Sequence, residues 1–138
     1  MGVSIDNTKA FMDGKGMHYR ATGDGKALFV GIGDMDNSPD IDILIVFGDD
    51  DKHVQMRLTD MCKFPEGKMG NMFKTCSDVN ARFRWIKFYV NRERVSITAE
   101  TDAVISPETA GSEVFELIMR MANIVDEAYP TFMKAVWS

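Results

Sequence analysis

The sequence predicts an α+β fold, an antiparallel sheet of strands flanked by helices, because the spacing of its apolar residues changes three times. In residues 69–83 the apolar positions recur every three or four residues, as on one face of a helix. In residues 85–99 they alternate in two runs separated by a polar turn, as in a β-hairpin. In residues 114–128 the helical period returns. The expected order of elements along the chain is α-β-β-β-β-α-β-β-α.

A short helix and four strands are expected before residue 69. Strands at 17–21 and 54–58 alternate between apolar and polar residues, which indicates one buried face. Strands at 27–32 and 41–47 are apolar at nearly every position, which indicates interior strands buried on both faces. A polar loop is expected at 34–40. The helix begins the chain and ends near a glycine, with three apolar residues on one face: Ile5, Phe11 and Met12.

Two helices and a hairpin are expected after residue 69. The closing helix has Ser106 as a candidate N-cap and Pro107 as its first residue, where a missing N–H does no harm. The helix before the hairpin has an apolar face made of Met69, Met72, Phe73, Cys76, Val79 and Phe83.

The length and charge of the chain exclude several classes of protein. A chain of 138 residues fits a single domain over residues 1–138 that can bury its own core. The 21 acidic and 16 basic residues give a net charge of -5, which disfavours broad attraction to nucleic acid or anionic lipid. The longest apolar runs are far shorter than the roughly 20 residues of a membrane-spanning helix. With no basic leader before an apolar segment, we expect a cytoplasmic protein in which Cys62 and Cys76 stay reduced.

The sequence offers no coherent set of catalytic, cofactor-binding or metal-ligating residues. The segment Gly23 to Lys26 lacks the earlier glycine and the following hydroxyl of a phosphate-binding loop. The aspartates from Asp34 to Asp42 are interrupted where a calcium loop needs its turn glycine, and Ile45 stands in place of the bidentate glutamate. The two histidines and two cysteines have no zinc-site spacing. We therefore expect no cofactor and no enzyme activity, and an enzyme that these patterns fail to detect stays an alternative.

One face of the predicted hairpin carries large aromatic residues. Trp85, Lys87 and Tyr89 alternate with the apolar residues of the same strand, so they are expected to share its outer face. Basic residues gather from Arg82 to Arg94, so an RNA-binding sheet is an alternative, although the glycines of the RNA-recognition consensus are missing. The favoured interpretation is that the terminal helix or a partner subunit covers these aromatics, most economically in a homodimer.

Methionine is unusually common, with 11 copies. Flexible thioether side chains can line a surface that adapts to different apolar partners. The alternative interpretation is ordinary core packing, in which methionine fills the volume that leucine fills elsewhere. The candidates for such a protein contact are Met69 and Met72 on the central helix and Met119 and Met121 on the closing helix.

Four segments of the second half carry a family resemblance: the strand at 54–58, the helix end Asp78-Val79-Asn80, the hairpin at 85–97 and the helix segment Asp126-Glu127-Ala128-Tyr129-Pro130. In these segments the chain resembles the YbjN-domain proteins, a family of bacterial sensory transduction regulators with the fold of type III secretion chaperones. The first fifty residues match only in general layout. The resemblance implies no known cofactor and a regulatory or chaperone-like, protein-binding role. Its partner is unknown.

Overall fold

The computed structural model describes residues 2–138 and confirms the expected α+β fold and element order. A single turn of 3-10 helix, η1, precedes the central helix. The elements are α1 (Val3–Gly14), β1 (Tyr19–Ala21), β2 (Ala27–Ile32), β3 (Ile41–Phe47), β4 (His53–Lys63), η1 (Glu66–Lys68), α2 (Met69–Arg82), β5 (Lys87–Asn91), β6 (Ser96–Val104) and α3 (Ala110–Trp137).

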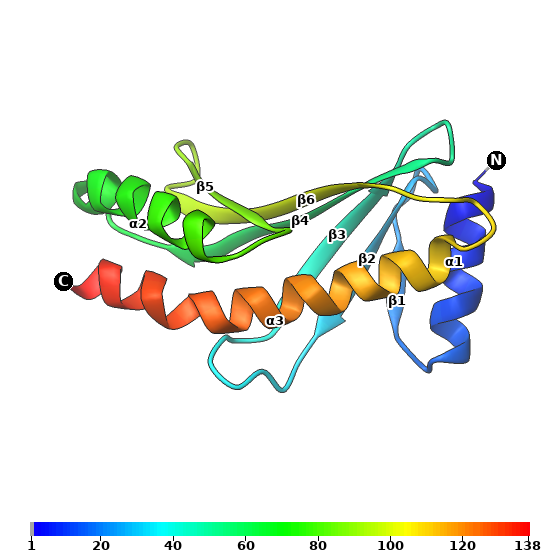
Figure 1. Ribbon diagram of the computed structural model, residues 1–138, viewed down its shortest axis with the longest axis horizontal. Coiled ribbons are helices and arrows are strands. Elements are labelled where there is room, and N and C mark those ends of the chain that lie inside the picture. The colour runs from blue at the N-terminus through cyan, green and yellow to red at the C-terminus, as the bar shows by residue number, and fades with distance from the viewer. Residues whose placement is uncertain (1) are drawn as a thin grey trace.

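The six strands form one antiparallel sheet in the order β1-β2-β3-β4-β6-β5. Figure 1 shows α3 running along one face of this sheet, α1 crossing one end of the molecule and α2 lying beside β5. Among the helices of residues 2–138, none lies over the opposite face (Figure 1). The molecule is therefore a sheet with one covered face and one uncovered face.

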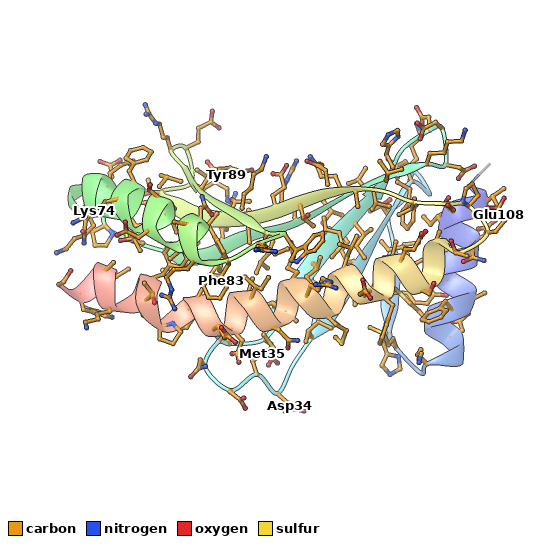
Figure 2. The ribbon with its side chains drawn as sticks, in the orientation of Figure 1. Asp34, Met35, Lys74, Phe83, Tyr89 and Glu108 are labelled. Carbon is orange, nitrogen blue, oxygen red and sulfur yellow. The ribbon has the colours of Figure 1, made fainter. Side chains whose placement is uncertain are left out.

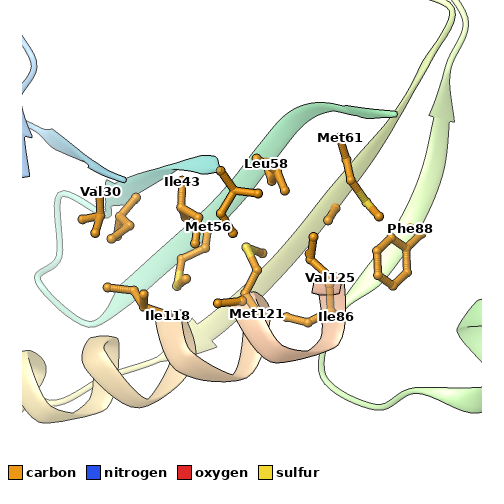
Figure 3. Packing of buried hydrophobic residues seen from close by; sticks show 14 of the residues in the cluster. Val30, Ile43, Met56, Leu58, Met61, Ile86, Phe88, Ile118, Met121 and Val125 are labelled. Atoms are coloured by element: carbon orange, nitrogen blue, oxygen red, sulfur yellow. The ribbon is translucent and has the colours of Figure 1, made fainter. Parts of the chain in front are cut away.

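The core lies between the sheet and α3 because both elements present apolar residues at their own period. Ile118, Met121 and Val125 recur on one stripe of α3 and are fully buried. They meet inward-facing side chains of the strands, including Ile43 and Met56, as Figure 3 shows. At the other end of α3 the rings of Phe88 and Phe132 lie 5.3 Å apart, centroid to centroid.

The closing helix begins later than the sequence predicts, at Ala110 instead of Pro107. Residues 106–109 form a turn in which the Thr109 N–H donates to the Ser106 carbonyl over 3.0 Å. The Glu113 carboxylate reaches back and accepts a hydrogen bond of 2.9 Å from the Ser106 N–H. The prediction of the start was wrong because this turn satisfies the same backbone groups that an N-cap would satisfy.

Burial also differs from two expectations. Phe73, expected on the apolar face of α2, is 41% exposed, and the Arg92 guanidinium lies 5.2 Å from the centre of its ring. β2 and β3 are interior strands of the sheet, but β3 is not buried on both faces, since Leu44 is half-buried and Val46 is exposed. The continuous apolar pattern predicts burial on both faces, whereas one of the two faces is uncovered.

Candidate protein-contact surface

The uncovered side of the sheet is the most extensive feature available for binding. Its residues come from all six strands, because alternate side chains of each strand point away from α3. Figure 2 shows side chains standing on this side of the strands. We call this surface the open face and define it by Arg20, Ala27, Phe29, Asp42, Leu44, Val46, Gln55, Arg57, Lys87, Tyr89, Glu100, Asp102 and Val104.

The strand register arranges these residues in lateral rows. Each member of a row is the Cα partner of its neighbour on the next strand. The first row crosses the whole sheet and consists of Arg20, Phe29, Leu44, Arg57, Glu100 and Lys87. The second consists of Ala27, Val46, Gln55 and Asp102.

The open face has an apolar centre on β2 and β3. Phe29 and Leu44 are half-buried, and Val46 is 36% exposed. Two shallow hollows of about 560 and 490 Å³ flank Val46, and Val104, which lines the larger one, is 78% exposed. An antiparallel sheet that meets water on one side normally turns polar residues outward, so this apolar surface is an exception to the usual pattern.

The half of the open face nearer β5 is held by a polar network around the buried carboxylate of Glu100. The side-chain amide of Gln55 donates to Glu100 over 2.9 Å, and the Tyr89 hydroxyl donates to it over 2.8 Å. Arg57 donates in turn to the Gln55 carbonyl oxygen over 2.8 Å. Burial raises the pKa of Tyr89, and its hydrogen bond to Glu100 raises this pKa further. These side chains are therefore fixed against one another.

The charges of the open face cancel. Three cations, Arg20, Arg57 and Lys87, stand against three anions on the same surface. Arg20 lies 2.9 Å from Asp42, and Arg57 lies 3.5 Å from Glu100. The net charge of -5 consequently resides on the rest of the molecule.

Both edges of the sheet are poorly suited to pairing with another strand. At one edge β1 has only three residues. At the other edge Asn80 of α2 bonds both backbone groups of Phe88 in β5: its amide nitrogen donates to the Phe88 carbonyl over 3.0 Å, and its oxygen accepts from the Phe88 N–H over 2.8 Å. A side chain thus occupies groups that a further strand would need.

The prediction that Trp85, Lys87 and Tyr89 share the outer face of the hairpin is partly wrong. Lys87 and Tyr89 lie on the open face, but Trp85 precedes β5 and has a positive φ of 76°. This backbone conformation breaks the alternation before the strand begins. The Arg120 guanidinium of α3 lies 4.8 Å from the centre of the Trp85 ring, which is therefore directed toward the helix side and is 61% exposed.

The methionine candidates divide into two groups. Met72 and Met121 are fully buried and belong to the core, as the packing interpretation holds. Met69 and Met119 are partly buried against that core. The four side chains thus do not form one exposed groove, because helix periodicity turns two of them toward the sheet.

The basic residues of the 82–94 segment serve separate partners. Arg94 bonds Asp60, with its Nε 2.8 Å from a carboxylate oxygen. Arg92 lies over Phe73, and Arg82 lies 5.2 Å from the centre of the Phe83 ring. Since Tyr89 also uses its hydroxyl within the sheet, the segment does not present the continuous row of cations and free aromatics that stacks RNA bases.

The structure also shows where the candidate reactive side chains lie. His53 Nδ1 lies 2.6 Å from a carboxylate oxygen of Asp50, beside the larger hollow. Among the described residues, no nucleophilic side chain contacts this pair. Within residues 2–138 no cluster of three or more His, Cys, Asp or Glu side chains could hold a metal ion. Cys62 and Cys76 are free and buried, and burial raises the pKa of both thiols, that of Cys76 to about 12. Such thiols are poor nucleophiles and poor metal ligands.

Sequence reasoning missed the apolar centre of the open face and the network around Glu100. The signal was present at 27–32 and 41–47, where apolar residues occupy both faces of the strands. The sequence of a strand does not show whether its second apolar face is covered or open, because the covering depends on where the helices pack.

Comparisons with known proteins bear on the whole chain. A family model described as "YbjN: Putative bacterial sensory transduction regulator" matches residues 4–134. A solved structure described as "Crystal structure of YbjN, a putative transcription regulator from E. coli" is similar, with a TM-score of 0.61 and 14% identity over 91% of each chain. No curated protein matches significantly. In residues 2–138 we find no helix that combines the length and the apolar character needed to cross a membrane.

Proposed function

The chain belongs to the YbjN family, and on that premise we propose that it is a non-enzymatic regulator that binds a protein through the open face of its sheet. The observation that supports this proposal is the apolar surface formed by Phe29, Leu44 and Val46 on an uncovered face. Contiguous apolar surface that stays in water favours association, and a protein contact removes it from water.

The shape of the open face suits a protein better than a small molecule. Small-molecule sites are enclosed and cover most of the ligand, whereas the two hollows beside Val46 are shallow. The combination of an apolar centre with charged side chains around it is the usual anatomy of a protein interface.

The polar network argues for binding and against catalysis. Glu100, the most buried carboxylate on the open face, already accepts hydrogen bonds from Gln55 and Tyr89. A catalytic acid or base needs access to a substrate proton, and these groups are occupied by one another. The network instead fixes the polar side chains next to the apolar surface against one another.

The edges of the sheet indicate how a partner docks. Addition of a strand from the partner would require free backbone groups at β5, and Asn80 occupies those of Phe88. We therefore place the contact on the face of the sheet and not on its edge.

We also place the protein in the cytoplasm, where two free thiols persist without forming a disulfide.

The test compares three forms of the tagged protein in a lysate of the cell that makes it: the unmodified chain, Val46→Lys and Phe73→Lys. Val46 and Phe73 are similarly exposed, at 36% and 41%, but only Val46 lies on the open face. A protein captured by the unmodified chain and by Phe73→Lys, and lost with Val46→Lys, is the expected result. Equal capture by both variants would refute the proposed surface, and an excess of absorbance at 260 nm in the purified protein would favour the RNA-binding alternative.

A further inference from the structure

We propose that the connection between α2 and β5, together with the adjoining side of α3, is a second docking surface that binds an acidic segment of another protein. We call it the arginine–tryptophan surface and define it by Arg82, Arg84, Trp85 and Arg120. It lies on the side of the sheet that carries α3, opposite the open face. The inference therefore goes beyond the proposed function, because it adds a second contact that can be occupied at the same time as the first.

The backbone at Trp85 is strained. The Ile86 N–H donates to the Arg84 carbonyl over 2.8 Å, and Trp85 between them has a φ of 76°. This arrangement is a γ-turn with a positive φ at its central residue, the rare and strained form of the turn. A bulky side chain tolerates such a φ poorly, whereas glycine adopts it readily. Backbone strain in native proteins gathers at sites of function, so the strain here points to a use for the ring.

The strain is not compensated by burial of the Trp85 side chain. Trp85 is 61% exposed, whereas the next residue, Ile86, is 3% exposed and belongs to the core. The Arg120 guanidinium lies 4.8 Å from the centre of the Trp85 ring and covers part of it. A partner that packs on the rest of the ring removes a large apolar surface from water. Tryptophan and arginine are also the residue types that most often dominate the binding energy of protein interfaces.

The charge of the surface selects an acidic partner. The chain has a net charge of -5, yet three arginines flank this one ring. Arg82 and Arg84 are exposed, and the side chain of Arg120 is 41% exposed. Arg120 has one acidic contact, with Glu116 over 3.4 Å. Among the described residues, neither Arg82 nor Arg84 forms an ion pair with a carboxylate. Their guanidinium groups are therefore available to bind carboxylates of a partner, which they match in shape and charge.

A protein segment fits this surface better than RNA does. Proteins that bind single-stranded RNA stack successive bases on several exposed rings. In the connection after α2, Phe83 is half-buried and the Arg82 guanidinium lies 5.2 Å from its centre, so Phe83 does not offer a second free ring. Tyr89 points to the open face and donates its hydroxyl to the sheet. One free ring among arginines instead matches an acidic peptide that carries a single aromatic or apolar side chain.

Fluorescence anisotropy with labelled probes tests the proposal. The main probe is a short peptide of glutamate and aspartate with one phenylalanine at its centre. The comparison probes are the same peptide with lysine in place of each acidic residue and an oligouridine of similar length. The unmodified protein should bind the acidic peptide, more weakly as salt is added, and should bind both comparison probes at least about tenfold more weakly. Equal or tighter binding of either comparison probe would refute the acidic partner.

The variant Trp85→Gly separates binding from folding. Glycine fits the positive φ, so the urea midpoint of this variant should equal or exceed that of the unmodified protein. Its affinity for the acidic peptide should nevertheless fall by about tenfold or more. Arg84→Gln should weaken binding too and reduce its dependence on salt. Phe73→Ala is the matched control, because Phe73 is another exposed ring beside an arginine, Arg92, at 5.2 Å, and it should bind the peptide as the unmodified protein does.

Four results would overturn the proposal: no binding of the acidic peptide by the unmodified protein, full binding by Trp85→Gly, an equal loss with Phe73→Ala, or a lower urea midpoint for Trp85→Gly, which would assign the ring to folding. Sedimentation analysis adds a fifth, since a dimer that Trp85→Gly converts to monomer would assign the surface to a second copy of the chain. Val46→Lys should bind the peptide normally, because Val46 lies on the open face. Failure of the peptide to bind therefore leaves the proposed function standing.

Discussion

The contact between α1 and α3 at Gly111 allows the sharpest prediction about stability. A Cβ atom added at this position would lie 2.9 Å from Phe11 Cγ and 3.0 Å from the Asn7 carbonyl oxygen, with Phe11 Cβ nearer still. Ordinary carbon contacts need about 3.5 to 4.0 Å, so the two helices must separate. Separation also strains the 2.8 Å hydrogen bond from the Gly111 N–H to the Asn7 side chain.

Two opposing effects set the expected magnitude for Gly111→Ala. Overpacking of a tight contact destabilises by about 1 to 3 kcal/mol. Alanine in place of glycine inside a helix stabilises by about 0.5 to 1 kcal/mol. The crowded atoms include backbone and a Cβ, which cannot move aside by a rotamer change. The difference between the two effects spans about 0 to 2.5 kcal/mol, and we expect a net loss of unfolding free energy in the upper part of this range because overpacking dominates.

Urea unfolding measures this loss as a lower transition midpoint at unchanged slope. Gly70→Ala in α2 is the matched control, because a Cβ there meets no atom within 4 Å. The control should be neutral or stabilised by up to about 1 kcal/mol. If Gly111→Ala were as stable as Gly70→Ala, the close packing of α1 on α3 would be refuted.

Three further predictions concern the edge of the sheet, the pairing of Arg94 with Asp60 and the thiols. Asn80→Ala removes both hydrogen bonds to Phe88, and urea unfolding should show a loss of about 1 to 3 kcal/mol; an unchanged midpoint would contradict the role of Asn80 at this edge. The hydrogen bond from Arg94 lowers the pKa of Asp60 below its unfolded value, so the stability that this carboxylate contributes is present above about pH 4 and is lost as the pH falls. The urea midpoint of the unmodified protein should therefore drop more between pH 7 and 3 than that of Asp60→Asn, and equal drops would refute the pairing. Both buried cysteines should resist alkylation in the folded protein, react after unfolding and show no loss of two hydrogens by intact mass without reductant; rapid alkylation in the folded state would contradict their burial.

The sequence predicted those features that depend on local spacing. The helical period in 69–83 and the alternation in the hairpin identify α2, β5 and β6, since amphipathic patterns reflect the faces that each element buries. The order of all nine major elements is confirmed for the same reason. The family resemblance, drawn from the second half of the chain, is also confirmed by the match over residues 4–134.

The errors occurred where distant residues decide the local conformation. Ser106 lacks the N-cap role because residues 106–109 form a separate turn and α3 begins only at Ala110. Trp85 departs from the strand pattern through a positive φ, which no residue type other than glycine signals clearly. Phe73 faces solvent beneath Arg92, a contact with the turn after β5 that helix periodicity does not contain.

The candidate site was predicted only in part, because its centre is exposed only where the helices pack on the other face of the sheet. Lys87 and Tyr89 do lie on the open face. The central residues Leu44 and Val46 belong to a strand whose apolar pattern equally fits burial on both faces. The homodimer remains a prediction, and Trp85, one of the residues expected in its interface, lies outside the open face.

A photocrosslinking measurement in living cells tests most directly whether the open face is the contact surface. A photoreactive phenylalanine analogue placed at position 46 samples the centre of the face, and the same analogue at position 73 samples a similarly exposed site on α2. If the open face is the contact surface, irradiation should give protein adducts from position 46 and few or none from position 73. Adducts from position 73 alone, or equal yields from both positions, would contradict the assignment of the open face as the binding surface.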